Sequence, residues 1–386
     1  MDIQSVFFGL LQVAVCGETA TEELKTACTD ETLEKVNALA IRYDLAHLIG
    51  LGISKLNLPQ SGVAKLCMQQ QMQAMFRFVQ LEYEYNRVCN VLENAEIPFL
   101  PLKGSVLRAW YPEPWMRTSC DMDILVHEKD LEKASDALQS QLQYTLAGRG
   151  AHDWAFSAPG GVHLELHYTV IESTELTMLP KLMQSIWGEA RPADGKQYHM
   201  TLSDAMFYCY HIAHMAKHFE IGGCGIRPFL DIWVLQNRVS YDPAAREQLL
   251  EKGGLLQFAK AAENLSRVWF SGAESDPVST QMEKFIFGGG SYGGVENRVA
   301  VNRAKENGKV RYLLNRVFLP YESMKQCYPM LEKQKWLLPF CHIARWSKRL
   351  CDGGVARSAK EMQVNATITQ EKTLTTAQLL EHLGLK

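Results

Sequence analysis

The feature that most constrains the fold is a short acidic strand pattern. Residues 120–127 read CDMDILVH, an apolar run interrupted by two carboxylates at alternate positions. Such a run predicts a β-strand, and alternate side chains of a strand share one face, so Asp121 and Asp123 point the same way. Two neighbouring carboxylates repel each other, and burial makes their ionisation costlier. A divalent cation such as Mg²⁺ removes both costs, so the pair predicts a metal site.

A second strand pattern carries a third acid. Residues 162–168 read VHLELHY, in which Leu164 and Leu166 alternate with Glu165 and His167. An acid between two leucines needs a polar face. If this strand pairs beside residues 120–126, the three carboxylates converge. Three such carboxylates can hold two metal ions for in-line displacement at phosphorus.

A Gly-Ser pair lies upstream of the acids. Gly104 and Ser105 follow a predicted strand over residues 97–102 and precede a predicted short helix over residues 105–111. Backbone N–H groups at such a junction bind anions, and the Ser105 hydroxyl can donate to a phosphate oxygen. Lys103 and Arg117 flank the site and could neutralise phosphate charge.

These motifs together resemble those of a known superfamily. Gly-Ser at the start of a helix, Asp-x-Asp on the next strand and a later acid on another strand are similar to the DNA polymerase β-like nucleotidyltransferases. More narrowly, residues 101–126, 162–168 and 214–233 look like a bacterial family of uncharacterised nucleotidyltransferases. The resemblance covers roughly residues 95–240 and the helical flanks loosely.

The resemblance implies roles for particular residues. Gly104 and Ser105 would hold a nucleoside triphosphate, Asp121 and Asp123 would bind metal, and Glu165 would be the third acid. This sequence has a Lys before the Gly-Ser pair and Glu in place of Asp at 165. The implied cofactor is Mg²⁺ or Mn²⁺, and the resemblance does not supply the acceptor.

Further residues are candidates for lining a pocket. Lys217, Arg227 and Asp231 belong to the family-like segment, and three histidines, His211, His214 and His218, share one helix face. Seven residues of helix rise about 10 Å, so at most two of these histidines reach one ion, which argues against a zinc site. The predicted pocket set is His167, His214, Lys217, His218, Arg227 and Asp231.

The patterning predicts an α+β fold in three parts. Residues 1–96 form a helical region, residues 97–201 a small mixed-sheet nucleotidyltransferase core, and residues 202–386 a helical domain. In a long helix predicted over residues 63–93, one face carries Met68, Met72, Met75, Phe76, Val79 and Tyr83. Pro159-Gly160-Gly161 predicts a hairpin turn, and residues 365–375 are expected to be weakly ordered.

Composition limits the partners. The formal net charge of −3 predicts neither a nucleic-acid partner nor a membrane surface. The chain has ten cysteines without a CxxC pair, which favours reduced thiols and a cytoplasmic location. The apolar run over residues 6–16 has no preceding basic residue, so it predicts a buried or amphipathic helix rather than a secretory signal.

The leading hypothesis is transfer of a nucleoside monophosphate from a nucleoside triphosphate to a small-molecule or protein acceptor, with release of pyrophosphate. A glycosyltransferase could also use Asp-x-Asp to bind a nucleotide sugar through a metal. That alternative predicts an α/β nucleotide domain before the motif, where the first 96 residues look helical. A non-catalytic nucleotide-binding or regulatory protein is the third hypothesis.

Overall fold

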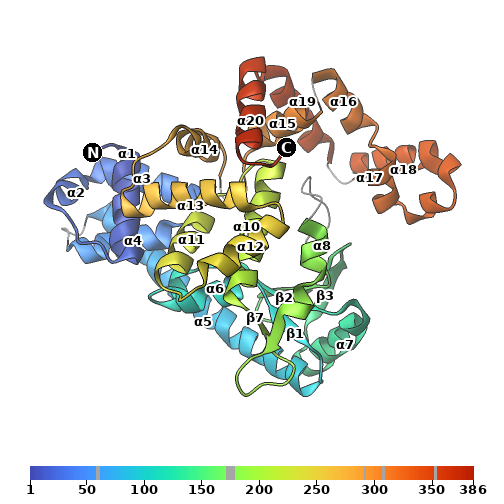
Figure 1. Ribbon diagram of the computed structural model, residues 1–386, viewed down its shortest axis with the longest axis horizontal. Coiled ribbons are helices and arrows are strands. Elements are labelled where there is room, and N and C mark those ends of the chain that lie inside the picture. Colours follow the sequence, from blue (N-terminus) through green and yellow to red (C-terminus); the bar gives the residue numbers. More distant parts are fainter. Residues whose placement is uncertain (58–60, 171–178, 291–292, 307–308, 352–353) are drawn as a thin grey trace. The chain divides into compact units, whose positions relative to one another are not determined.

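The computed structural model describes residues 1–57, 61–170, 179–290, 293–306, 309–351 and 354–386 (Figure 1). The chain divides into two compact units. Unit 1 comprises Met1–Lys217 and Ile226–Thr280, and unit 2 comprises His218–Gly225 and Gln281–Lys386. The predicted boundaries after residues 96 and 201 both fall inside unit 1, and the three-part division stays a prediction. A mixed sheet within a mostly helical chain confirms the α+β fold class.

Unit 1 begins with helices that precede the sheet. They are α1 (Ile3–Leu11), which continues into a π-helical turn at Gln12–Cys16, α2 (Glu22–Ala27), α3 (Asp30–Arg42), α4 (Ala46–Leu56) and α5 (Gly62–Asn94). The side chains of Asp2, Thr21, Thr29 and Ser61 accept backbone hydrogen bonds at four of the helix starts. Val6, Leu10 and Leu11 of α1 are fully buried, so the first apolar run is a buried helix.

Close backbone approach joins α4 to α5. A side chain at Gly50 would place its Cβ 2.2 Å from the carbonyl oxygen of Cys67, which is a forbidden distance. Glycine at this position therefore lets the two helices pack with their backbones nearly in contact.

The five-stranded sheet has the order β1-β2-β5-β4-β3. The strands are β1 (Phe99–Pro101), β2 (Asp121–Val126), β3 (Thr145–Arg149), β4 (Asp153–Ser157) and β5 (His163–His167). Only β2 and β5 pair in parallel; the other three pairs are antiparallel. The β4–β5 pair is the predicted hairpin around Gly160 and Gly161.

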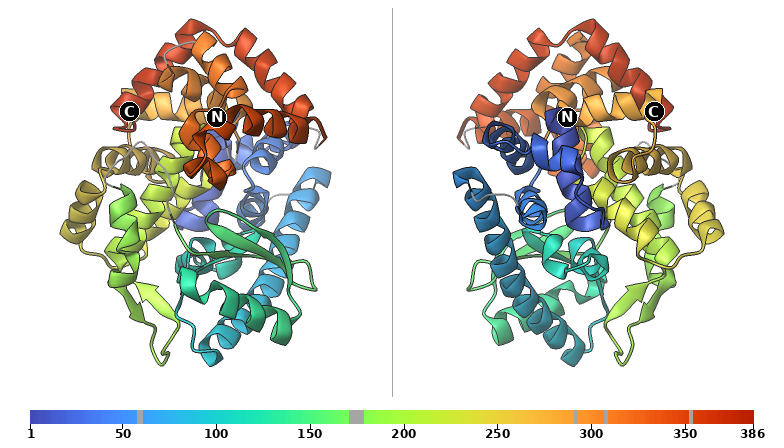
Figure 2. Two further views of the ribbon diagram at one scale, coloured as in Figure 1. Left: turned by 90° about the vertical axis from the view of Figure 1, so that its right-hand side faces the viewer. Right: turned by 90° about the vertical axis from the view of Figure 1, so that its left-hand side faces the viewer.

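One sheet face forms a hydrophobic core with two helices. Met122, Ile124, Leu164 and Leu166 are fully buried there, together with apolar residues of α5 and of α7 (Leu131–Leu142). Figures 1 and 2 show α5 running along the sheet. Because strand side chains alternate, Asp121, Asp123 and Glu165 point to the opposite face.

The apolar face predicted on the long helix does not pack into this core. Met72, Phe76, Val79 and Tyr83 of α5 are 62–71% exposed. The buried positions are instead Ala64, Cys67, Ala74, Leu81, Glu84, Val88, Cys89, Val91 and Leu92. The first half of α5 packs through small residues, which leaves its large apolar side chains in solvent.

The remaining elements of unit 1 are a short helix between the first two strands and a series of elements that follows the sheet and leads into α14. They are α6 (Gly104–Leu107), which lies between β1 and β2, then α8 (Leu179–Gln184), α9 (Ile186–Glu189), the two-stranded sheet β6 (Ala190–Pro192) and β7 (Met200–Leu202), α10 (Asp204–Ile221), α11 (Arg227–Asn237), α12 (Pro243–Lys252), α13 (Leu256–Ser271) and α14 (Pro277–Phe287). Helix α10 ends, and α14 continues, in unit 2.

Unit 2 is helical. Its further helices are α15 (Val295–Lys305), α16 (Lys309–Val317), α17 (Tyr321–Cys327), α18 (Leu338–Cys351), α19 (Gly354–Thr367) and α20 (Gln370–His382). The expectation of a weakly ordered segment over residues 365–375 is wrong. Helix α20 starts there with Thr369 as its N-cap, and Ile368 is buried against Val299 and Tyr312.

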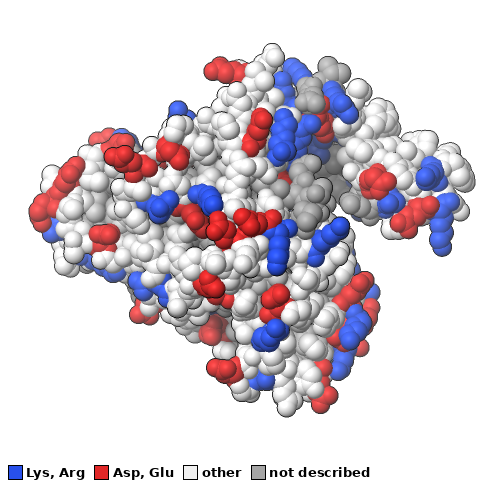
Figure 3. All heavy atoms as spheres, in the orientation of Figure 1, with Lys and Arg blue, Asp and Glu red and all other residues white. Residues whose placement is uncertain are grey.

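The charged surface, the helix lengths and the cysteines bear on the predictions made from composition. On the face drawn in Figure 3, acidic and basic side chains are interspersed. None of the helices in the described ranges is long and apolar enough to cross a membrane. Nine of the ten cysteines, those whose side chains the structure describes, are free thiols, and Cys67, Cys89 and Cys209 are among the buried ones.

Candidate functional site

Strand register brings the predicted acids together. Strands β2 and β5 lie side by side in parallel, with Asp123 directly opposite Glu165 and Asp121 opposite His163. The pairing that the sequence required for convergence of the acids is therefore present. Alternation in both strands restricts the register of this pair, because a one-residue slip would turn the leucines of β5 away from the core.

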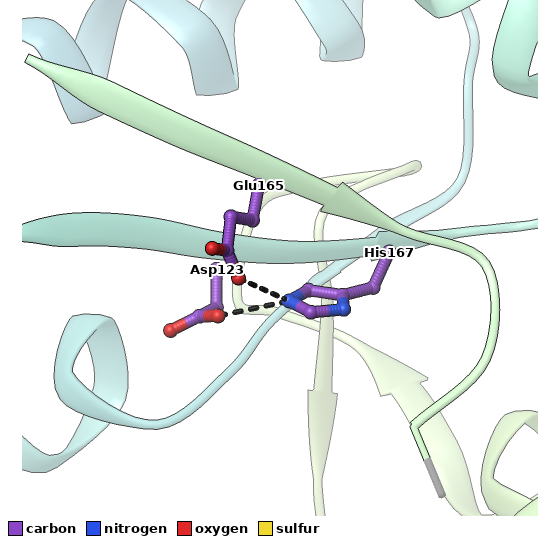
Figure 4. Close-up of side chains that lie close together, drawn as sticks. All are labelled: Asp123, Glu165 and His167. Carbon is purple, nitrogen blue, oxygen red and sulfur yellow. Dashed lines mark hydrogen bonds and ion pairs between the residues drawn. The ribbon is translucent and has the colours of Figure 1, made fainter. Parts of the chain in front are cut away.

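Asp123, Glu165 and His167 form a close group (Figure 4). The His167 Nε2 atom lies 2.8 Å from Asp123 Oδ1 and 3.3 Å from Glu165 Oε2. Asp123 and His167 are buried, whereas the Glu165 side chain is 37% exposed. One ligand atom from each residue lies within 4.8 Å of the other two, so the group could hold a metal ion.

Lys103 reaches the same carboxylate from a strained turn. Its Nζ donates to Asp123 Oδ1 at 2.7 Å. Its backbone has φ 45° and ψ −122°, a region that non-glycine residues seldom occupy. The Ser105 N–H closes the turn on the Leu102 carbonyl at 3.2 Å, and the Leu102 N–H donates to the Asp123 carbonyl at 2.9 Å. The turn therefore holds the Lys103 side chain beside β2.

Gly104 and Ser105 start the four-residue helix α6. A Cβ at Gly104 would lie 3.2 Å from that of Ser119, so the glycine allows this close contact. The buried Arg108 fixes both sides, donating to the Gly104 carbonyl and to the Ser119 hydroxyl at 3.0 Å each. Ser105 Oγ is buried and has no hydrogen-bond partner among the described residues.

The two aspartates differ in electrostatics. Burial raises the pKa of Asp123, but the hydrogen bond from His167 and the charge of Lys103 outweigh burial and hold it below its ordinary value. The pKa of Asp121 is raised, first by burial and then by the charge of Asp123. The charge of Lys103 opposes this rise but does not outweigh it, so Asp121 is the carboxylate of the pair with the less complete charge compensation.

His167 carries positive charge into the group. Burial lowers its pKa, but its hydrogen bonds to Asp123 and Glu165 prevail and raise the pKa to about 9. The hydrogen bond from His167 also lowers the pKa of Glu165. At neutral pH a protonated His167 and Lys103 supply the charge that these carboxylates need, which is the role a divalent cation can take.

Arg117, Arg227 and Asp231 gather in a second cluster. The Arg117 guanidinium donates to both Asp231 oxygens at 2.7 and 2.9 Å, and the Tyr111 hydroxyl donates to Asp231 at 2.7 Å. Arg227 binds the Thr118 carbonyl at 3.0 Å. These contacts tie the loop before β2 to α11. The predicted contact of Arg117 with a nucleotide stays a prediction.

Helix α10 contributes a residue that sequence reasoning missed. Tyr210 is buried, and the charges of Lys103, Asp123 and Glu165 act on its hydroxyl, although burial is the main cause of its raised pKa. The His214 ring lies 6.4 Å from the Tyr210 ring. Lys217 and His218 follow on α10 and are not members of the Asp123, Glu165 and His167 group. Tyr210 sits in an apolar helical pattern without a distinguishing signal.

Comparison with known proteins identifies a matching family. The sequence model of a family described as uncharacterised nucleotidyltransferases matches residues 29–271, which is more than half of the chain and includes β1–β7. Searches of curated proteins and of solved structures found no match.

Proposed function

Because the chain belongs to the family of uncharacterised nucleotidyltransferases, we propose that it moves a nucleoside monophosphate from a nucleoside triphosphate to an acceptor and releases pyrophosphate. The observation that carries this proposal is the meeting of Asp123, Glu165 and His167 on one sheet face beside Lys103. Acidic residues that hold a divalent cation, with a lysine for the phosphates, are the usual parts of a phosphoryl-transfer site.

In the proposed reaction an acceptor oxygen forms a bond to the α-phosphorus, and the bond from that phosphorus to the bridging oxygen breaks. Lys103 binds the triphosphate through its charge, and the Ser105 hydroxyl donates to a phosphate oxygen. Glu165, which has the most exposed side chain of its group, takes the acceptor's proton as general base. The residues would act mainly by positioning and by charge neutralisation.

The proposed cofactor is Mg²⁺ or Mn²⁺, held by Asp121, Asp123 and Glu165. The donor set fits, because carboxylates on paired strands face one side of the sheet, and burial and the charge of Asp123 raise the pKa of Asp121 despite Lys103. A bound divalent cation neutralises phosphate charge and lowers the pKa of the attacking group. The acceptor is a small molecule or a protein, and the free thiols favour a cytoplasmic location.

The arrangement before the motif supports nucleotidyl transfer over glycosyl transfer. A glycosyltransferase of the Asp-x-Asp type would carry an α/β nucleotide domain there, whereas helices α1–α5 precede β1. The non-catalytic alternative remains distinguishable because it predicts nucleotide binding without pyrophosphate release.

The test measures pyrophosphate release by the purified full-length chain with each nucleoside triphosphate, Mg²⁺ or Mn²⁺, and pools of candidate acceptors. We expect Asp123→Asn and Glu165→Gln each to lower the rate by about 100-fold or more. The matched control is Asp130→Asn, because Asp130 lies near the same sheet but outside the site. Activity that survives the Asp121→Ala, Asp123→Ala double substitution would refute this site.

A further inference from the structure

The Asp123, Glu165 and His167 group contains a nitrogen donor, which the acidic motif alone does not predict. His167 Nε2 faces both carboxylates, and its ring is buried with Asp123 rather than turned to solvent (Figure 4). Asp123 Oδ1 already accepts hydrogen bonds from two side chains, those of Lys103 and His167. The three ligand atoms thus converge at a carboxylate oxygen that binds basic groups.

The spacing of these atoms matches one octahedral ion. Bonds of about 2.1 Å at right angles place neighbouring ligand atoms about 3 Å apart. The observed separations from His167 Nε2 are 2.8 Å to Asp123 Oδ1 and 3.3 Å to Glu165 Oε2. The ligand atoms of Asp123 and Glu165 lie within 4.8 Å of each other. A single ion can therefore contact all three residues once the side chains turn from their hydrogen bonds toward it.

The donor types select among divalent ions. Mg²⁺ and Ca²⁺ prefer oxygen ligands, whereas imidazole favours transition metals. Mn²⁺ accepts carboxylates and water as Mg²⁺ does and, as a transition metal, binds imidazole more readily than Mg²⁺ does. Two carboxylates with one imidazole therefore favour Mn²⁺ over Mg²⁺.

The geometry points to a metal centre in which His167 is a direct ligand through Nε2 and which binds Mn²⁺ more tightly than Mg²⁺. This inference rests on the metal site of the proposed function and names its ion. Its ligand set is Asp123, Glu165 and His167, so His167 takes the place that the proposed function gives to Asp121, which is not a member of this group. The remaining positions are open to water and to substrate phosphate.

The experiment measures metal binding to the full-length protein without nucleotide. Mn²⁺ and Mg²⁺ affinities come from calorimetry, and pulsed electron paramagnetic resonance of bound Mn²⁺ detects a coordinated nitrogen. We expect Mn²⁺ to bind at least tenfold more tightly than Mg²⁺ and to show nitrogen coupling. His167→Asn should remove the coupling and weaken Mn²⁺ binding at least tenfold, while Mg²⁺ binding changes less than threefold.

His163→Asn is the matched control, because His163 lies two residues earlier on β5, is exposed and contacts Ser157. The His163→Asn protein should keep both the nitrogen coupling of bound Mn²⁺ and the tighter binding of Mn²⁺ than of Mg²⁺. Bound Mn²⁺ without nitrogen coupling, or a His167→Asn protein with unchanged preference, overturns the inference. If His167→Asn does not fold, the coupling in the unsubstituted protein decides.

The two proposals fail separately. A nitrogen-ligated Mn²⁺ in a protein that releases no pyrophosphate sustains the metal centre and refutes nucleotidyl transfer. Pyrophosphate release by a protein whose metal has only oxygen ligands sustains nucleotidyl transfer and refutes the nitrogen-ligated metal centre.

Discussion

At the residue scale, Lys103 joins backbone strain to the chemistry of the site. A positive φ in a non-glycine residue costs about 1–3 kcal/mol, and such residues concentrate at functional sites. Here the strained turn delivers Nζ to Asp123 Oδ1 at 2.7 Å. Glycine would adopt this backbone without strain but would have no amine to deliver. The sequence thus keeps a costly residue where its charge is needed.

Two substitutions separate the charge of Lys103 from its strain. Lys103→Met removes the cation that competes for Asp123, so we expect metal to bind several-fold more tightly and nucleoside triphosphate about tenfold more weakly. Lys103→Gly should reproduce both effects and in addition unfold at a higher temperature than Lys103→Met, because it relieves the turn. Calorimetric titration and thermal unfolding measure these effects. Unchanged triphosphate affinity in Lys103→Met would show that the amine does not bind phosphate.

At the element scale, a buried ion pair fixes the loop that enters β2. Asp231 on α11 is fully buried and binds Arg117 and Tyr111 of that loop. The Arg117 charge lowers the pKa of Asp231 despite its burial. The pair therefore holds α11 against the segment that positions Asp121.

Breaking this pair should cost more than replacing it. Asp231→Asn leaves the Arg117 charge buried and unpaired, so we expect it to lower the free energy of unfolding by about 3–5 kcal/mol. The Arg117→Met, Asp231→Leu double substitution removes both charges, so it should lower the free energy of unfolding clearly less than Asp231→Asn does. Urea titrations of the two variants give the comparison. Equal losses would mean that packing, not the uncompensated charge, sets the cost.

At the scale of unit 1, a buried neutral histidine links stability to pH. His47 on α4 donates to the Met116 carbonyl at 2.9 Å. Burial lowers the pKa of His47 from 6.5 to about 4, although the hydrogen bond and the charge of Asp44 oppose it. Between these pH values the unfolded chain binds a proton that the folded chain excludes. The contribution of His47 to stability is therefore full above pH 6.5 and is lost as pH falls toward 4.

We expect unit 1 to lose about 2 kcal/mol of its free energy of unfolding between pH 7 and pH 5 through this residue. His47→Gln cannot take up a proton and should remove that part of the pH dependence. Urea titrations at the two pH values test the expectation, with His163→Gln as an exposed control that keeps the dependence. Identical pH dependence in His47→Gln and the unsubstituted protein would assign the effect to other groups.

The sequence by itself determined the face of each site strand on which the acids lie. Alternation in residues 120–126 and 162–168 puts the apolar side chains of each strand on one face and the acids on the other. A one-residue slip would reverse these faces, whereas the exact register, with Asp123 opposite Glu165, is set by the packed sheet. The sequence also determined the Gly-Ser turn, because the conformation of a turn depends mainly on the residues within it. These features depend on periodicity and turn chemistry, which act over a few residues.

Only the tertiary structure decided which side chains complete the group. His167 reaches Asp123 from β5 and Lys103 from the turn before α6, and Tyr210 arrives from a helix whose pattern marks it as core. Tertiary packing likewise turned the large apolar residues of α5 to solvent, since helical spacing defines a face but not what lies against it. Contacts between distant segments depend on how elements pack, and no short stretch of sequence encodes that packing.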